Sequence, residues 1–175
     1  EPIWQRAAMR GLLMGRLAQA LGLDAWGAHS AGLFEECGKA VLFRHASDHY
    51  RAMLRASSND AELCQLEHTG FGVSHDALGA ALCESWGLGP AVVASVRHHV
   101  MAQGLLELPG PPARRAVLML SAVAAAMLGG QPEAVDEVVH RLAPQADLDA
   151  MPLLRTARRL ADEMAEALAH GRAPG

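Results

Sequence analysis

The stretch Ala31-Gly32-Leu33-Phe34-Glu35-Glu36-Cys37-Gly38-Lys39 places two adjacent carboxylates between two glycines, in a segment whose apolar residues recur at helical spacing. Asp24 precedes this segment and is a favourable N-cap, so the pattern predicts one helix from Asp24 to about Lys39. Because glycine has no Cβ, Gly32 and Gly38 would allow neighbouring helices to approach closely. The stretch therefore predicts a closely packed helix that carries a pair of acidic side chains.

Helical periodicity extends over the whole chain of 175 residues. Apolar residues make up 51% of the chain but aromatic residues only 4%, which favours helices, because strands select β-branched and aromatic side chains. Caps, prolines and glycines divide the pattern into expected helices over residues 3–21, 24–39, 41–56, 61–69, 74–86, 90–103, 113–128, 132–142 and 151–170. We therefore expect an all-α protein, a compact bundle of eight or nine helices with no sheet.

We expect these helices to form a single domain over residues 1–170, followed by a disordered tail at residues 171–175. The chain begins without a methionine and enters a helix within a few residues, so it is expected to be a piece of a longer protein. Trp4 and Trp86 are expected to anchor the core, because large aromatic side chains bury the most apolar surface.

The charge and the cysteine content limit the classes of partner. The formal net charge is -4, so no domain-wide positive field is present to attract nucleic acid. Cys37, Cys64 and Cys83 are odd in number and share no CxxC spacing, which indicates reduced thiols that pack as small buried hydrophobes. No basic and apolar leader opens the chain, and its longest apolar stretch is too short to span a bilayer. We therefore expect a soluble, cytoplasmic protein that binds neither membranes nor nucleic acid.

Nine histidines raise the question of a metal or catalytic site. Six of them are expected at exposed or half-exposed helix positions, where histidine is seldom a ligand: His29, His45, His49, His68, His140 and His170. The remaining three, His75, His98 and His99, belong to longer motifs and are the candidates for a site.

These motifs resemble those of a known family. Residues 31–39 resemble the "GLLHDIGK" helix of HD-superfamily phosphohydrolases, and the segment from Glu67 through Gly72 to His75 and Gly79 resembles "E…fG.dHa..Ga". The segment Trp86-Gly87-Leu88-Gly89-Pro90, followed by His98-His99, is similar to "W.LP…I..HH". Together, in this order and spacing, the three segments resemble the HDOD family, the HD-related output domain of bacterial signalling proteins.

The resemblance implies an HD-domain-like bundle and a set of metal ligands to look for. In catalytic HD enzymes a first-helix histidine, the His-Asp doublet, later histidines and a distal aspartate surround one or two divalent metals that activate a water. Here the first-helix histidine would fall near Trp4-Gln5-Arg6, which contains none, and the doublet falls on Glu35-Glu36. The distal aspartate would fall near Ser121-Ala122-Val123, and no carboxylate lies between residues 113 and 130. The ligand set implied by the resemblance is therefore degenerate.

Six residues remain as candidates for a vestigial site or a ligand pocket: Glu35, Glu36, Glu67, His75, His98 and His99. In the hypothesis we favour, Glu35 or Glu36 accepts hydrogen bonds from His75 and His99 in a buried polar network that fixes helix packing. Two alternatives stay open, a single divalent metal on Glu36, His75 and His99, or solvent exposure of some of these groups. Glu67 is expected to pair with the loop that presents His75. We assign no catalytic residue and no cofactor.

The resemblance implies a non-catalytic signalling or output domain that acts through protein–protein contacts. Its partners would be other signalling domains of the receiver, diguanylate cyclase or EAL type, and its mechanism would be conformational. The alternative is a metal-dependent phosphohydrolase or phosphodiesterase that acts on a nucleotide or cyclic dinucleotide. A third reading is a pocket that binds a nucleotide messenger without hydrolysing it.

Overall fold

The computed structural model describes residues 2–171, and within this range it contains helices and no strand. The all-α expectation is confirmed. The elements are α1 (Pro2–Ala20), α2 (Ala25–Phe34), α3 (Cys37–His45), α4 (Ser47–Ala56), α5 (Asp60–Phe71), α6 (His75–Ser85), α7 (Pro90–Leu105), η1 (Pro112–Arg114), α8 (Arg115–Leu128), α9 (Pro132–Leu142), η2 (Pro144–Ala146) and α10 (Ala150–Ala169). None of the described helices combines the length and the apolar character needed to cross a membrane.

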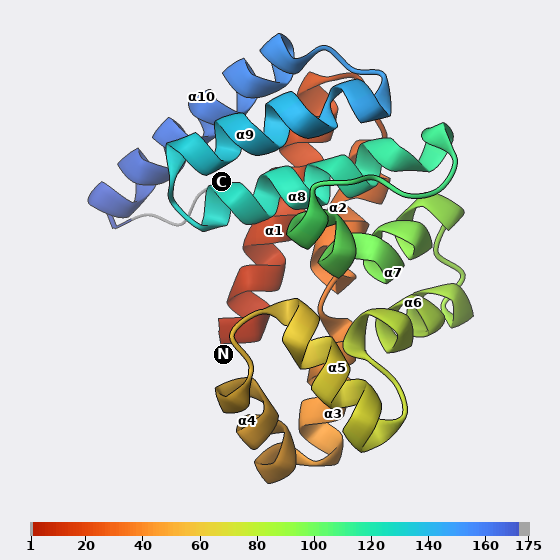
Figure 1. Ribbon diagram of the computed structural model, residues 1–175. Coiled ribbons are helices and arrows are strands. Elements are labelled where there is room, and N and C mark those ends of the chain that lie inside the picture. Colours follow the sequence, from red (N-terminus) through yellow and green to blue (C-terminus); the bar gives the residue numbers. More distant parts are fainter. Residues whose placement is uncertain (1, 172–175) are drawn as a thin grey trace.

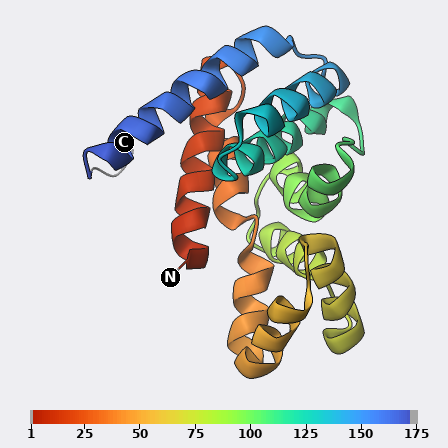
Figure 2. The same cartoon turned by 60° about the vertical axis from the view of Figure 1, so that its left-hand side comes forward.

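The helices form a group at each end of the molecule, and a middle layer of helices joins the two groups (Figures 1 and 2). The helices α3, α4 and α5 lie at one end, and α9 and α10 lie at the other. Between them, α1 packs against α2 and α8, while α7 packs against both α6 and α8. Residues from α1, α2, α5, α6, α7 and α8 can therefore meet near the centre of the molecule.

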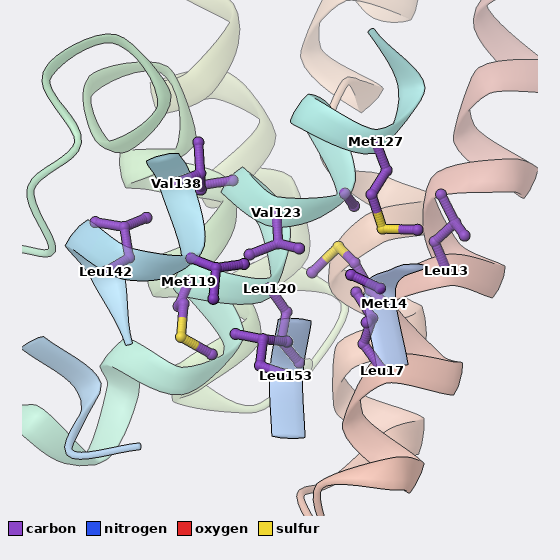
Figure 3. Close-up of a cluster of buried hydrophobic side chains, with 14 of the residues drawn as sticks. Leu13, Met14, Leu17, Met119, Leu120, Val123, Met127, Val138, Leu142 and Leu153 are labelled. Atoms are coloured by element: carbon purple, nitrogen blue, oxygen red, sulfur yellow. The ribbon is translucent and has the colours of Figure 1, made fainter. Parts of the chain in front are cut away.

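The main hydrophobic core joins α1 to the C-terminal helices (Figure 3). Leucine, methionine and valine side chains from α1, α8, α9 and α10 interdigitate there, among them Leu13, Met14, Leu17, Met119, Leu120, Val123, Met127, Val138, Leu142 and Leu153. Burying each such side chain stabilises the fold by about 1.5–3 kcal/mol. A smaller cluster around Leu42, Tyr50, Met53 and Leu63 holds α3, α4 and α5 together.

The helix expected from Asp24 to Lys39 is interrupted at the acidic pair. Asp24 does cap α2, because its side chain accepts a hydrogen bond from the backbone N–H of Gly27, but α2 ends at Phe34. At Glu36 the backbone leaves helical geometry, with φ -104° and ψ 18°, and α3 starts at Cys37. Successive side chains of a helix point about 100° apart, so the break allows both carboxylates to face the same group on α1.

The helix expected over residues 41–56 is also divided. Its break falls at Ala46, where φ is -147° and ψ is 69°, so that α3 ends at His45 and α4 begins at Ser47. The turn folds α4 back beside α5, where Tyr50 and Met53 are buried. The tertiary burial of these two side chains accounts for a break that the local sequence does not signal.

Two glycines beside the acidic pair permit the close contacts that the sequence predicts. A Cβ on Gly32 would lie 2.8 Å from both Cα and N of Gly11, so α1 and α2 touch here backbone to backbone. A Cβ on Gly38 would fall onto the carbonyl group of His75, at the start of α6. These contacts fix the acidic pair against α1 on one side and against α6 on the other.

The tryptophans do not anchor the core as expected. Trp4 is 61% exposed and Trp86 is 54% exposed, and the ring of Trp86 makes a tilted contact with that of Phe34, at a centroid distance of 5.6 Å. Trp4 lies in the first turn of α1 and Trp86 is the residue that follows α6, and apolar character permits burial without requiring it. Of the three free cysteines, Cys83 is buried, whereas Cys37 and Cys64 are half-buried. The expected tail falls mostly on residues 172–175, which lie outside the described residues.

Substituting Gly38 tests the contact between α3 and α6. Because an added methyl group would meet backbone, which cannot rotate away, Gly38→Ala is expected to lower the free energy of unfolding by about 1–3 kcal/mol. Gly104→Ala, also within a helix but with no atom within 4 Å of an added Cβ, is the matched control and is expected to stabilise the protein by up to about 1 kcal/mol. Urea unfolding followed by circular dichroism measures both. Equal effects of the two substitutions would contradict the assigned close contact.

Candidate functional site

A buried arginine occupies the centre of the candidate site. Arg10, from the middle of α1, is only 2% exposed. Its guanidinium forms ion pairs with Glu35 and Glu36, through Nε and Nη2 respectively, each at 3.0 Å. Its Nη1 donates a hydrogen bond of 3.3 Å to the carbonyl oxygen of Gly32. A single planar cation therefore satisfies both adjacent carboxylates, which are themselves buried.

Glu35 also reaches the helices on the other side of the site. The hydroxyl of Ser121, on α8, donates a short hydrogen bond to one oxygen of Glu35. The side-chain amide of Gln103, on α7, donates to the other oxygen at 3.5 Å and to Ser121 at 3.3 Å. The resemblance places a distal aspartate near Ser121, and the structure has a neutral hydrogen-bond donor there.

Glu36 is connected to α5 through Lys39. The Nζ of Lys39 lies 3.5 Å from Glu36 and 3.1 Å from Asp60. Burial raises the pKa of Glu36, but the positive charges of Lys39, Arg10 and Arg6 outweigh it and hold that pKa below its ordinary value. The pKa of Asp60 is also held below its ordinary value, because burial raises it but nearby positive charge, chiefly that of Lys39, outweighs burial. Both carboxyl groups are therefore kept ionised by their partners.

A second polar cluster surrounds His75, the first residue of α6. Glu67, fully buried on α5, accepts hydrogen bonds of 2.7 Å from both the backbone N–H and the Nδ1 of His75. The hydroxyl of Tyr50 donates to the other oxygen of Glu67. Burial and the Glu67 carboxylate raise the pKa of Tyr50, so its hydroxyl stays protonated as a donor. Glu67 thus pairs with the segment that presents His75, as the sequence suggested.

The second histidine of this cluster is His99, on α7. Its ring lies with its centroid 5.5 Å from that of His75, and its Nδ1 is 2.7 Å from the carbonyl oxygen of Val96. One ligand atom each from His75, His99 and Asp60 lie within 4.8 Å of one another. The two histidines and Asp60 therefore form a compact group of potential metal ligands.

The structure gives the acidic pair other hydrogen-bond donors than the sequence predicted. Glu35 and Glu36 accept bonds from Arg10, Lys39, Ser121 and Gln103, and not from His75 and His99 as the favoured hypothesis had it. A buried carboxylate gains more from a full positive charge than from a neutral imidazole, which gives the physical reason.

His98 does not belong to the cluster. It is half-buried on another side of α7, where it lines a separate hollow with Glu84, Arg97 and Arg114. Burial and the neighbouring charge of Arg97 lower its pKa. Adjacent helix positions point in different directions, so of the pair His98-His99 only His99 can face the interior.

Sequence reasoning missed Arg10, Lys39, Tyr50 and Asp60. A signal for Arg10 was present, since it shares the helical spacing of Ala7, Met14 and Leu17, which are all buried. An arginine in an apolar stripe must be paired when buried, and therefore calls for acidic partners.

The metal centre implied by the resemblance does not fit the acidic pair. A metal held by Glu35 and Glu36 would share these carboxylates with a permanent cation at 3.0 Å and would be repelled by it. Among the described residues, the groups that could hold a metal contain neither of the two glutamates; they are Asp60, His75 and His99, and also Cys64, Glu67 and His75. The combination of Glu36, His75 and His99 suggested by the sequence is not among them.

Arg10→Met tests whether the guanidinium holds the site together. Removing it leaves two adjacent carboxylates buried without a cation, so we expect the free energy of unfolding to fall by about 3–5 kcal/mol. Arg16→Met, on the same helix, removes a half-exposed arginine that pairs with Glu163 at the surface, and is expected to cost less than about 1 kcal/mol. Adding Glu35→Gln and Glu36→Gln to Arg10→Met should restore part of the loss. Urea unfolding at neutral pH measures all of these variants, and equal losses for the two single arginine substitutions would refute the assignment.

Comparison with known proteins places this geometry in a family. The model of the HDOD domain matches residues 1–102. Among curated proteins no match is found. Among solved structures, the chain is similar to a "Putative phosphohydrolase" from Shewanella amazonensis SB2B, with a TM-score of 0.68 and 17% identity, over 95% of this chain and 63% of that one. It is also similar to the MmoQ response regulator from Methylococcus capsulatus str. Bath, with a TM-score of 0.64 and 18% identity, over 89% of this chain and 60% of that one.

The chain spans less than two thirds of the length of either structure. At these identities the likeness shows a shared fold. The family match covers more than half of the chain. The chain belongs to the HDOD domain family.

Proposed function

We propose that this chain is a non-catalytic signalling module, an output domain that acts through contacts with other proteins. The observation that carries the proposal is the buried ion pairing of Arg10 with Glu35 and Glu36. Where the HD resemblance implies a metal and its activated water, this chain supplies a guanidinium. A guanidinium neutralises the carboxylates but has no open coordination position at which a water could be acidified.

The rest of the acidic pair's surroundings supports a structural role. Ser121 and Gln103 donate hydrogen bonds to Glu35 in addition to Arg10, and Lys39 contacts Glu36. Ser121 joins α8 and Gln103 joins α7 to the junction of α2 and α3, while Lys39, on α3 itself, connects the junction to Asp60 on α5. The cluster therefore acts as a packing device, and a change in the position of one helix would be transmitted to the others.

Exposed tryptophans offer a surface for a partner. Trp26, in the first turn of α2, is 81% exposed and stacks on the ring of His29 at 6.2 Å. Trp4 on α1 and Trp86 after α6 are more than half exposed. Tryptophan is enriched at the centres of protein–protein interfaces and is costly to leave in water. The partners implied by the family resemblance are receiver, diguanylate cyclase or EAL-type domains.

A second candidate is a metal-dependent phosphohydrolase that acts on a nucleotide or cyclic dinucleotide. One observation favours it, the proximity of Asp60, His75 and His99, within 4.8 Å of one another. The fold is also shared with a protein named as a phosphohydrolase. The third reading, a nucleotide-messenger pocket without hydrolysis, would appear as a thermal shift with the messenger.

Hydrolysis assays separate the first two candidates. With Mn²⁺ present, the purified chain is expected to hydrolyse neither bis(p-nitrophenyl) phosphate nor cyclic di-GMP faster than a metal blank, because both carboxylates of the acidic pair are engaged by Arg10. Release of nitrophenolate and chromatography of the nucleotide measure this. Turnover that disappears in His75→Gln would overturn the proposal in favour of the phosphohydrolase.

A binding assay tests the interaction itself. The chain is titrated with receiver, diguanylate cyclase and EAL-domain proteins encoded in the same genome, and binding is followed by isothermal calorimetry. Trp26→Ala is expected to weaken the complex by at least about 2 kcal/mol, the size of an interface hot spot. Leu54→Ala, at a 38% exposed position on α4, serves as the control and should leave the affinity nearly unchanged. Absence of binding to all three classes would count against the proposed partners.

A further inference from the structure

Two buried nitrogen atoms have no hydrogen-bond partner within the described part of the chain. They are the Nε2 atoms of His75 and His99. The two side chains are 0% and 1% exposed, so bulk water does not solvate these atoms. A buried polar atom without a partner costs about 1–3 kcal/mol. Two such atoms on neighbouring rings therefore indicate that something binds between them.

The contacts of the two Nδ1 atoms determine what the Nε2 atoms can bind. Nδ1 of His99 faces a carbonyl oxygen, that of Val96, and must donate to it. Nδ1 of His75 faces the carboxylate of Glu67 at 2.7 Å and donates likewise. In the neutral rings both Nε2 atoms therefore carry lone pairs. A histidine held by a carboxylate or carbonyl at one nitrogen, with the other nitrogen free, has the arrangement of a metal ligand.

Asp60 supplies an anionic third ligand. It is the first residue of α5, and one of its oxygens lies within 4.8 Å of the ligand atoms of His75 and His99. Since both Nδ1 atoms are already engaged, Nε2 is the atom each ring has available. Asp60 also lines a groove of about 720 Å³ together with Cys64, Asp76 and Gln103. The groove therefore reaches the carboxylate of Asp60, while His75 and His99 lie buried behind its lining.

The charges around this position favour a cation. Asp60, Glu67 and Asp76 contribute negative charge, and Lys39 at 3.1 Å from Asp60 offsets only part of it. Their effect is seen at Cys64, whose pKa is raised to about 12 by burial and by the negative charges of Asp76, Glu67 and Asp60. The Sγ atom of Cys64 lies 3.7 Å from Nδ1 of His75, the nitrogen that faces Glu67, so Cys64 is a neighbour of the two Nε2 atoms and not grouped with them.

We propose that Asp60, His75 and His99 bind one divalent transition-metal ion of the Zn²⁺ class, through a carboxylate oxygen and two imidazole Nε2 atoms. Such ions take mixed nitrogen and oxygen ligands, and with three protein ligands a water would complete the coordination. The site shares His75 and His99 with the histidine motifs of the HD resemblance, but its carboxylate is Asp60, which belongs to none of those motifs, and it uses neither Glu35 nor Glu36. It goes beyond the proposed signalling function, since it adds a ligand that would fix α5, α6 and α7 to one another.

Replacing Lys39 tests the proposal through a gain in metal affinity, which a misfolded variant would not show. Its ammonium group pairs with Asp60 and repels a metal bound to the same carboxylate. Lys39→Met is therefore expected to strengthen metal binding by about tenfold. A destabilised variant would bind more weakly, so a gain in affinity reports on the site itself.

The experiment titrates the metal-free chain with Co²⁺, read from its visible absorption, and repeats the titration as a thermal shift with Zn²⁺. The native chain is expected to bind one ion and to melt at higher temperature when loaded. Asp60→Asn and His99→Gln should each weaken binding by at least about tenfold. His98→Gln, next to His99 on α7 but in a different hollow, is the matched control and should bind as the native chain does. Circular dichroism checks that each variant is folded.

Three results would overturn the proposal. The native chain could show no binding, in which case a bridging water is the partner of the two Nε2 atoms. Binding could persist undiminished in Asp60→Asn and His99→Gln. It could instead be lost in Glu35→Gln and kept in Asp60→Asn, which would place the metal at the acidic pair. None of these results bears on whether the chain binds its signalling partners, so the two proposals can fail separately.

Discussion

The ion pairs between Arg10 and the adjacent carboxylates of Glu35 and Glu36 are the interaction on which the centre of this molecule depends. Removing three charged groups from water costs several kcal/mol for each, and only close contacts of opposite charge offset that cost. The geometry supplies them, because one guanidinium meets both carboxylates and the Gly32 carbonyl. The contact requires α1 and α2 to touch, which the glycines at the crossing allow. It also requires α2 to end at Phe34, so that both glutamates can face α1.

From this centre, charges of alternating sign lead across the molecule. Arg10 is followed by Glu36, then by Lys39, then by Asp60, and each makes contact with the next. Asp60 lies beside His75 and His99, and His75 is held by Glu67, which is held in turn by Tyr50. Helices α1, α3, α4, α5, α6 and α7 all contribute a member. Replacing a fully enclosed member of this network, such as Arg10 or Glu67, would leave a buried neighbour unpaired.

The sequence predicts well those features that depend on residues close together in the chain. The bounds of α9, Pro132–Leu142, and the helical face of α7 follow from nearby prolines, glycines and apolar spacing. The break at Glu36 was not predictable in this way, because its cause lies on another helix, in Arg10. The exposure of Trp4 and Trp86 was missed because apolar character permits burial but does not require it. Motif resemblance located His75 and Glu67, whereas Asp60 belongs to no motif and was read only as part of a turn.

A metal ion and an arginine can both offset the repulsion between neighbouring carboxylates. Each therefore lets several carboxylates, and the helices that carry them, meet in a low-dielectric interior. They differ in chemistry. The arginine is part of the chain and is always charged, so its ion pairs with the carboxylates are permanent and leave no position for an exchangeable ligand. A metal held by imidazoles and a carboxylate can leave, and its affinity follows the protonation of its ligands. With Arg10 holding the acidic pair, the proposed metal site falls to His75, His99 and Asp60, whose carboxylate is shared with Lys39. The permanent cation holds α1 to the junction of α2 and α3, and an exchangeable one would control how α5, α6 and α7 meet.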